Sequence, residues 1–286
     1  MEQSLRKIGD HTAIQTVQPV SGGEIRQAYY VKTEQQAYFI KTNQGVTGNF
    51  FKVEADGLER IRATGTIAVP EVYYYDETID NQEMVLILEW IQGETSATTA
   101  QQLGKQIAAL HLAPAAPHYG MEHPTFVGEL IQPNKWYDNW INYFHEQRLL
   151  PQLDLAIQQK RMPHARRAKL ETLLNRLDRY LPSHPRVSLL HGDLWGGNWL
   201  AGPHGKPYVI DPSVVYGDHL FELAFTELFH RFPDDFYSHY QTLLPIADYY
   251  QEVKPIYQLF YLLVHLNIFG EGYGSSVDQI LKKYAG

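Results

Sequence analysis

The sequence predicts an α+β fold of two lobes, a small β-rich lobe at residues 1–90 and a large helical lobe at residues 91–286. Two observations lead to this prediction. Runs of β-branched and aromatic residues joined by tight turns fill the first lobe, whereas helical patterns dominate after the polar connector QGETS. The chain of 286 residues, 44% hydrophobic, is also long and apolar enough to bury a large core.

The first lobe is predicted to be a sheet with one inserted helix. Alternating or continuously apolar runs predict strands, with turns between them, at 13–20, 27–33, 36–43, 69–76 and 83–91. The segment NFFKVEADGLERIRAT places apolar residues three and four positions apart from Phe51 to Ile61. This spacing forms one face of a helix, which we expect over about 50–62.

The second lobe is predicted to be mostly helical. Apolar spacing and helix-ending residues predict helices at about 103–110, 134–159 and 163–181, and an apolar run predicts a short strand at 207–211. Trp140 has helical spacing with its aromatic neighbours and is expected in the core. Beyond residue 219 we expect three or four more helices, separated near Pro233, Pro255 and residues 270–274.

Composition excludes several kinds of chemistry. The chain has no cysteine, so disulfides, thiolate catalysis and cysteine-ligated zinc or iron–sulfur sites are excluded. The formal net charge is -8, and the basic run HARRAK at 164–169 follows a helical pattern typical of a solvated face, so nucleic acid is not an expected partner. We find no secretory pattern and no apolar run long enough to span a bilayer, so we expect a cytoplasmic protein without a membrane partner.

The stretch LLHGDLWGGNWL, residues 189–200, concentrates polar residues and glycines between apolar ends. Its spacing, His191-x-Asp193-x-x-x-x-Asn198, matches the kinase catalytic loop, in which the aspartate accepts the proton of the attacking hydroxyl and the asparagine holds magnesium. A polar turn capped by Asp193, with Asn198 in a left-handed conformation, would use the same residue types. In the same loop Trp195 could stack on the apolar face of a sugar.

A second carboxylate follows the first motif. Asp211 ends the strand PYVID 13 residues beyond Asn198, which leaves room for a hairpin that returns it to Asp193. One carboxylate and one amide oxygen, with water and phosphate, suit Mg²⁺, so Asn198 and Asp211 are the candidate metal ligands. An Asp-Pro pair is also a common end to a strand, and the histidines show no spacing that would indicate a transition-metal site.

The first lobe supplies the remaining parts of a nucleotide site. Lys41 lies between apolar neighbours in a strand, where its ammonium group needs a partner, and Glu54 on the following helix is the candidate. An ordinary surface ion pair would look the same in sequence. The turn Ser21-Gly22-Gly23 could direct backbone amides at phosphates, although a plain hairpin turn explains it equally well. The connector Glu89-Trp90-Ile91 could offer backbone groups to an adenine, or could simply end a buried strand.

Taken in this order, Lys41, Glu54, Asp193, Asn198 and Asp211 resemble the protein-kinase-like superfamily. The chain resembles, more specifically, the fructosamine kinase (ketosamine-3-kinase) family. The segments that carry this resemblance, from about residue 20 to 273, are SGGEIRQAYYV, FIKTN, EADGL, HGDLWGGNWL, IDPSVVYGD and HLNIFGEGY. HGDLWGGN is the most specific, since aminoglycoside and choline kinases share its His-Gly-Asp and Asn but not usually the Leu-Trp-Gly-Gly between them.

The resemblance implies an ATP-dependent transfer of phosphate to the 3-hydroxyl of ketosamines, the fructosamine or ribulosamine adducts of amines or protein lysines. The unstable product would release the amine, so the reaction would be a deglycation repair. The resemblance implies that Asp193 is the base, that Asn198 and Asp211 bind Mg²⁺, and that Lys41, held by Glu54, orients the phosphates. Residues 21–26 would cover the nucleotide, and Glu89, Trp90 and Ile91 would contact the adenine. The expected substrate contacts are Trp195, Tyr216 and Asp218.

The chain departs from the family pattern after Asp218. It has His219 and Leu220 in place of an Arg-Glu pair, and Glu222 in place of an aspartate, so the fit of the substrate at this wall is open. Two alternatives also remain. The acceptor could be an aminoglycoside-like or choline-like molecule, which needs the same carboxylates. A catalytically silent ATP-binding scaffold is the other, but it would be expected to lack one of the three site residues Asp193, Asn198 and Asp211.

Overall fold

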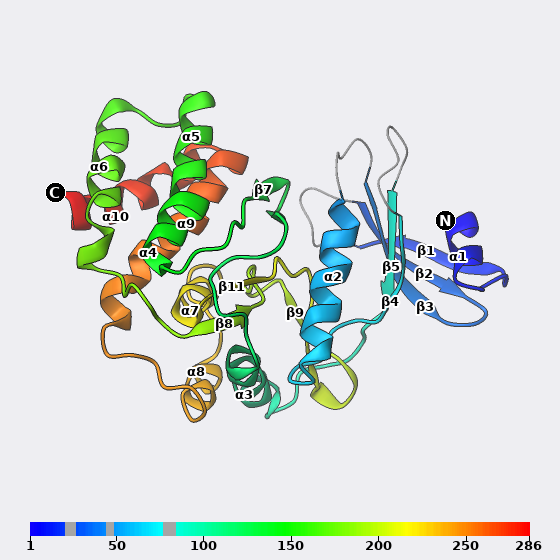
Figure 1. Ribbon diagram of the computed structural model, residues 1–286. Coiled ribbons are helices and arrows are strands. Elements are labelled where there is room, and N and C mark those ends of the chain that lie inside the picture. Colours follow the sequence, from blue (N-terminus) through cyan, green and yellow to red (C-terminus); the bar gives the residue numbers. More distant parts are fainter. Residues whose placement is uncertain (21–26, 44–48, 77–83) are drawn as a thin grey trace.

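The five strands expected in the first lobe form one antiparallel sheet (Figure 1). The computed structural model describes residues 1–20, 27–43, 49–76 and 84–286. Within them the strand order is β1-β2-β3-β5-β4, and the bounds are β1 Ile14–Pro19, β2 Gln27–Thr33, β3 Ala37–Asn43, β4 Val72–Tyr75 and β5 Met84–Glu89. Both neighbours of β3 pair with it in register, which places Lys41 opposite Ala28 on β2 and Leu86 on β5.

Strand β5 is continuously apolar because both faces of the sheet are covered. Leu86 and Leu88 belong to the large core shared with the helical lobe, on the side of helix α2 (Phe50–Ala63). Val85 and Ile87 belong to a smaller core with Leu5 on the opposite face. Successive side chains of a strand point to opposite faces, so a strand buried on both sides has no polar alternation. Helix α1 (Glu2–Lys7), which the sequence reading did not expect, supplies Leu5.

The second lobe is helical, as predicted. Its helices are α3 Thr99–Leu112, α4 Trp140–Tyr143, α5 Leu150–Gln158, α6 His164–Leu174, α7 His219–Thr226, α8 Asp234–Tyr240, α9 Tyr250–Phe269 and α10 Gly274–Ala285. Helix α9 packs against α5, α7 and α10, and Figure 1 shows the helices of this lobe gathered on the opposite side from the sheet. Trp140 is fully buried, as expected, and donates a hydrogen bond from Nε1 to the Tyr257 hydroxyl at 2.9 Å.

Three helix boundaries differ from the prediction. The helix expected from residue 134 begins at Trp140, and a π-helical segment, Phe144–Leu149, joins α4 to α5. The helix expected to reach residue 181 ends at Leu174 and is followed by a short 3₁₀ turn, Leu177–Arg179. Pro255 does not separate helices but lies inside α9. Its ring removes one hydrogen bond near the start of the helix, where Gln251 is exposed and water can replace the missing donor.

Short strand pairs position the loops between the lobes. Strand β8 (Val187–Leu190) pairs with β11 (Val215–Asp218), and β9 (Trp199–Ala201) pairs with β10 (Pro207–Val209), so the expected hairpin after Asn198 is present. A further hairpin, β6 (Thr125–Val127) and β7 (Leu130–Gln132), was not predicted, because three-residue strands leave no periodic signal. In the described part of the chain, no helix has the length and apolarity needed to cross a membrane.

Candidate active site

A cavity of about 670 Å³ lies between the sheet and the helical lobe. It collects the charged residues that the sequence singled out, although they come from four separate segments of the chain. Among the residues that line it are Lys41, Glu54, Asp193, Asn198 and Asp211, together with Trp195 and the connector residues Glu89, Trp90 and Ile91. Ser21, Gly22 and Gly23 lie outside the described residues.

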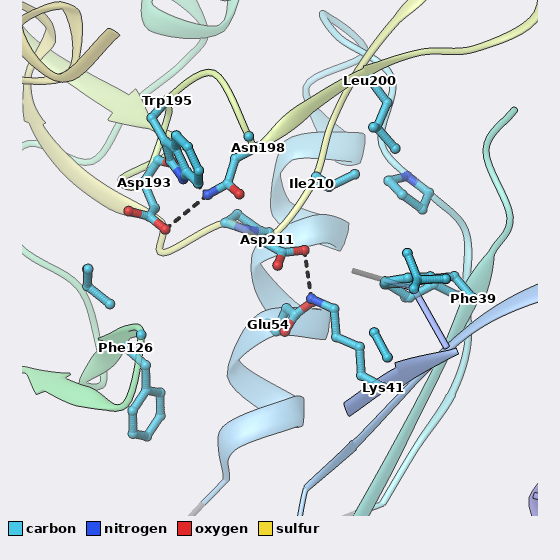
Figure 2. A pocket seen from close by; sticks show the side chains of 18 of the residues that line it. Phe39, Lys41, Glu54, Phe126, Asp193, Trp195, Asn198, Leu200, Ile210 and Asp211 are labelled. Carbon is cyan, nitrogen blue, oxygen red and sulfur yellow. Dashed lines mark hydrogen bonds and ion pairs between the residues drawn. The ribbon is translucent and has the colours of Figure 1, made fainter. Parts of the chain in front are cut away.

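Lys41 links the two lobes through a pair of carboxylates (Figure 2). Its Nζ lies 2.6 Å from Oε1 of Glu54 and 2.6 Å from Oδ1 of Asp211. Lys41 and Glu54 are buried, so each charge requires the other, and the expected ion pair is present. Asp211 is partly exposed and adds a contact that sequence reasoning did not foresee, across 170 residues of chain.

Local backbone geometry brings Asp211 to this position. It lies just after β10 with a φ of 56°, a left-handed conformation that aspartate tolerates better than most residues. The following Pro212 packs on α2 at Gly57, where a Cβ would lie 3.1 Å from the proline Cγ. Gly57 therefore allows the helix that carries Glu54 to approach the turn that carries Asp211.

Asp193 and Asn198 contact each other within the catalytic-loop motif. The Asn198 amide nitrogen donates to Oδ2 of Asp193 at 3.0 Å and to its backbone carbonyl at 2.8 Å. Both partners only accept, so the amide oxygen is directed away from the carboxylate. Figure 2 shows the Trp195 ring beside this pair. Together with Asp211, the site offers one amide oxygen and two carboxylates in a single cavity.

The connector lines the same cavity where strand β5 ends. Trp90 packs edge-on against Tyr30, with ring centroids 4.7 Å apart, and Glu89 and Ile91 also line the cavity. The expectation that backbone groups of this connector receive an adenine stays a prediction.

A family model, fructosamine kinase, matches residues 1–285. The chain belongs to the fructosamine kinase family. It is 38% identical over 267 residues to a probable ketoamine kinase of Enterococcus faecium, covering 93% of this chain and 94% of the relative. It is 37% identical over 286 residues to a probable ketoamine kinase of Synechocystis, covering 99% and 94%. This fructosamine kinase family member is therefore an ATP-dependent phosphotransferase.

Solved structures give the same result for the fold. A fructosamine-3-kinase structure from Haemophilus somnus superposes with a TM-score of 0.88 and 27% identity, covering 100% of this chain and 98% of the other. An aminoglycoside phosphotransferase (TM-score 0.65, 19% identity, 100% of both chains) and a choline kinase from Streptococcus pneumoniae (0.65, 17%, 98% of both) share the fold alone. The prediction of an α+β, protein-kinase-like fold is confirmed, as is the family resemblance.

Glu222 has a different place from the one its sequence position suggested. Rather than forming a substrate wall, its fully buried carboxylate accepts hydrogen bonds from the backbone N–H of His191 at 3.2 Å and of Gly192 at 2.6 Å. His111, on α3, contacts it through Nε2 at 2.8 Å. The carboxylate thus fixes the backbone at the start of the loop of residues 191–198. A glutamate inside the otherwise apolar helix HLFELAFT was the signal for such a role, since a buried charge needs several partners.

Electrostatics fix the protonation of this carboxylate. Burial alone would raise the pKa of the Glu222 carboxyl, but the hydrogen bond and charge of His111 and the hydrogen bond from the Gly192 N–H lower it. Burial lowers the pKa of His191. The neutral ring donates from Nε2 to the Ile210 carbonyl at 2.8 Å and accepts from the Asp193 N–H at 3.3 Å through Nδ1. His191 therefore connects the catalytic loop to the strand end that carries Asp211.

Two predicted substrate residues lie outside the cavity lining. Tyr216 stacks on Trp136, with ring centroids 6.1 Å apart, and its hydroxyl is 3.5 Å from Arg60. Asp218 is fully buried; it caps α7 by accepting from the Leu220 N–H at 3.0 Å and accepts from the Tyr257 hydroxyl at 2.6 Å. This placement gives Asp218 a structural role in place of the expected substrate contact.

The other two departures from the family pattern are buried as well. His219 lies 3.0 Å from the Tyr240 hydroxyl through Nδ1, and Leu220 is buried in the core. The same Tyr240 hydroxyl is 2.7 Å from Nδ1 of His111, the partner of Glu222. His219, Leu220 and Glu222 thus lie around the buried contacts that support the loop of residues 191–198, and they are absent from the lining of the cavity.

Replacing Gly192 should disturb the catalytic loop by steric conflict. Its φ is 85°, and a Cβ would lie 1.8 Å from the Ser213 carbonyl oxygen. We expect Gly192→Ala to lower the free energy of unfolding by at least about 2 kcal/mol and phosphotransfer more than about tenfold. Gly9→Ala is the matched control, with a φ of 82° and no heavy atom within 4 Å. Urea unfolding and ADP release measure both variants, and equal effects would contradict the steric argument.

The buried carboxyl of Asp218 should make the free energy of unfolding of the kinase depend on pH. Burial raises the pKa of its carboxyl from 3.8 to about 6, against the opposing hydrogen bonds. The folded chain keeps this proton where the unfolded chain has lost it, so the free energy of unfolding falls as the pH rises from about 4 to about 6. Asp218→Asn should remove a slope of up to about 1.4 kcal/mol per pH unit.

Urea unfolding at several pH values across this range measures the slope. The exposed Asp154→Asn is the control and should keep the wild-type slope. An Asp218→Asn variant with that same slope would show that the carboxyl does not titrate in this range.

Proposed function

We propose that this kinase transfers the γ-phosphoryl group of ATP to the 3-hydroxyl of a ketosamine. The observation that carries the proposal is the meeting of Asp193 and Asn198 with the Lys41–Asp211 ion pair in one cavity. Its relatives support the acceptor class, since those named above are ketoamine kinases.

Asp193 acts as the base in this reaction. Its carboxylate, oriented by the Asn198 amide, accepts the proton of the 3-hydroxyl as the hydroxyl oxygen bonds to the γ-phosphorus. The bond from that phosphorus to the β,γ-bridging oxygen breaks, and ADP leaves with the electron pair. The protein contributes mainly position and charge, which is what a loose phosphoryl-transfer transition state requires.

Lys41 and the metal ligands neutralise the phosphates. Glu54 holds the Lys41 ammonium group where the α- and β-phosphates would bind. The Asn198 amide oxygen and the Asp211 carboxylate would hold Mg²⁺, and both are the hard oxygen ligands that this ion prefers. The metal, when bound, supplies positive charge to the oxygens of the β- and γ-phosphates.

The nucleotide would lie along the first lobe, residues 1–90. Backbone groups of Glu89, Trp90 and Ile91 would receive the adenine at the connector. Residues 21–26, which the family resemblance assigns to the nucleotide, lie outside the described residues. The acceptor would then approach from the helical lobe, on the side of Trp195. Residues 91–286 form the catalytic and substrate lobe in this assignment.

The chemistry of the product gives the biological role. A ketosamine 3-phosphate eliminates phosphate readily and then releases its amine, so we assign the kinase to the deglycation of free amines or protein lysines in the cytoplasm. An aminoglycoside-like or choline-like acceptor is the alternative, since the same fold serves both classes in the structural neighbours. Binding of ATP without transfer is the second alternative.

ADP release with ATP and Mg²⁺ tests the function. The acceptors are fructosyl-, ribulosyl- and erythrulosyl-lysine, with choline and an aminoglycoside for comparison. We expect turnover on a ketosamine. Turnover on choline or the aminoglycoside alone would assign another acceptor, and tight ATP binding without any transfer would support the silent scaffold.

Substitution of the base tests the mechanism. Asp193→Asn keeps the size of the side chain but cannot accept the proton, so turnover should fall by about 10²- to 10⁴-fold while ATP affinity stays within about twofold. Asp178→Asn, at an exposed position, is the control. An Asp193→Asn variant with near-normal turnover would exclude the assigned role.

A further inference from the structure

Beyond Asp193 the cavity continues into an aromatic end formed by the segment after α7, by α9 and by the turn that follows α9. Phe229, His265, Phe269 and Tyr273 line it, and we call these four residues the aromatic subsite. The His265 ring lies at its centre, with centroids 4.5 Å from Phe229, 5.5 Å from Phe269 and 5.1 Å from Tyr273. Phe269 is 43% exposed, so its ring is accessible at the mouth of the cavity that it lines.

The aromatic subsite adjoins the catalytic loop. Gly196 of that loop lies against residues 229 and 230, since a Cβ there would be 3.2 Å from the His230 Cβ. Phe225 also lines the cavity, and its ring stacks on Tyr261 with centroids 3.6 Å apart. The Tyr261 hydroxyl donates to the Gly192 carbonyl of the same loop at 3.4 Å. An acceptor with its hydroxyl at Asp193 therefore extends naturally over these rings.

A buried arginine fixes the position of Tyr273. Arg166 donates two hydrogen bonds to Glu271, at 2.6 and 3.0 Å, and two to Asp278, at 2.8 and 2.9 Å. It belongs to the basic run that was expected on a solvated face, but it is 5% exposed. Gly274 makes room for it, because a Cβ there would lie 2.5 Å from Nη2. The turn that presents Tyr273 is thus held rigidly, as a preorganised binding surface requires.

The chemistry of a ketosamine matches this arrangement. Its amine is bonded to the carbon two positions from the one that carries the reacting hydroxyl, so the amine and its substituent lie next to Asp193. A secondary amine is protonated at neutral pH, and aromatic faces attract such a cation. Within the described chain, no lysine or arginine lines this end of the cavity, so a carboxylate beside the amine would lose its hydration without gaining a partner.

We propose that the aromatic subsite binds the protonated amine and the hydrocarbon arm attached to it. It thereby selects ketosamines on a lysine ε-amine over those on the α-amine of an amino acid, whose carboxylate is adjacent. The inference rests on the proposed function, and it names the part of the acceptor that decides specificity.

The test compares kcat/KM for two acceptors that carry the same sugar, one on the ε-amine of Nα-acetyl-lysine and one on the α-amine of glycine. The wild-type kinase should prefer the first by at least about tenfold. Tyr273→Leu and Phe269→Leu keep apolar volume but remove an aromatic face, so each should reduce this preference by about threefold or more through KM for the acceptor, with KM for ATP unchanged.

A gain of function sharpens the test. Phe269→Arg supplies a cation at an exposed position, so it should raise kcat/KM for the glycine adduct and lower it for the lysine adduct. Tyr249→Arg and Tyr249→Leu are the matched controls, because Tyr249 is 42% exposed and lies outside the lining of the cavity. Both controls should keep the wild-type ratio.

The outcomes separate the two proposals. A wild-type kinase that shows no preference between the adducts, or a preference that none of the aromatic variants changes, would overturn the aromatic subsite and leave the ketosamine kinase intact. A wild-type protein inactive on both adducts and on every other ketosamine would overturn the proposed function and the subsite together.

Discussion

The buried ammonium group of Lys41 joins the two lobes by charge inside the cavity. It lies between Glu54 on α2 and Asp211 after β10, at 2.6 Å from each carboxylate. Removing such charges from water costs several kcal/mol per ion, which only close partners offset. The sheet, the helix and the hairpin therefore have one relative position that satisfies all three groups. Gly57 and Pro212 provide the matching close contact between α2 and the hairpin end.

The catalytic loop is held by a second buried charge. Every residue of α7 is buried, yet the helix contains Glu222, whose carboxylate receives the N–H groups of His191 and Gly192. His111 completes its hydrogen bonds from α3. The core of the helical lobe thus does more than exclude water, because it fixes the backbone from which Asp193 projects. A substitution of one of these buried residues would therefore change the position of Asp193, although the substituted residue contacts no substrate.

The two ends of the cavity differ in chemistry. The end toward the sheet combines charged side chains with the connector, whereas the end toward α9 is aromatic. We propose that phosphoryl transfer takes place at the first end, since that reaction requires charged groups held in a fixed geometry. The aromatic end is the part of the cavity to which we assign the recognition of the acceptor.

Local sequence determined much of this protein. The alternation and apolar runs predicted the strands of the first lobe, helical spacing predicted α2 and α3, and the spacing of Asp193 and Asn198 indicated a kinase loop, because each of these signals is contained within a few residues. Only the tertiary structure decided what depends on contacts across the chain. Helix α9 continues through Pro255, Glu222 supports the loop, Asp218 is a buried cap, and Arg166 is buried between two carboxylates from distant segments. Burial and partners set the role of a charged side chain, and neither can be read from its neighbours in sequence.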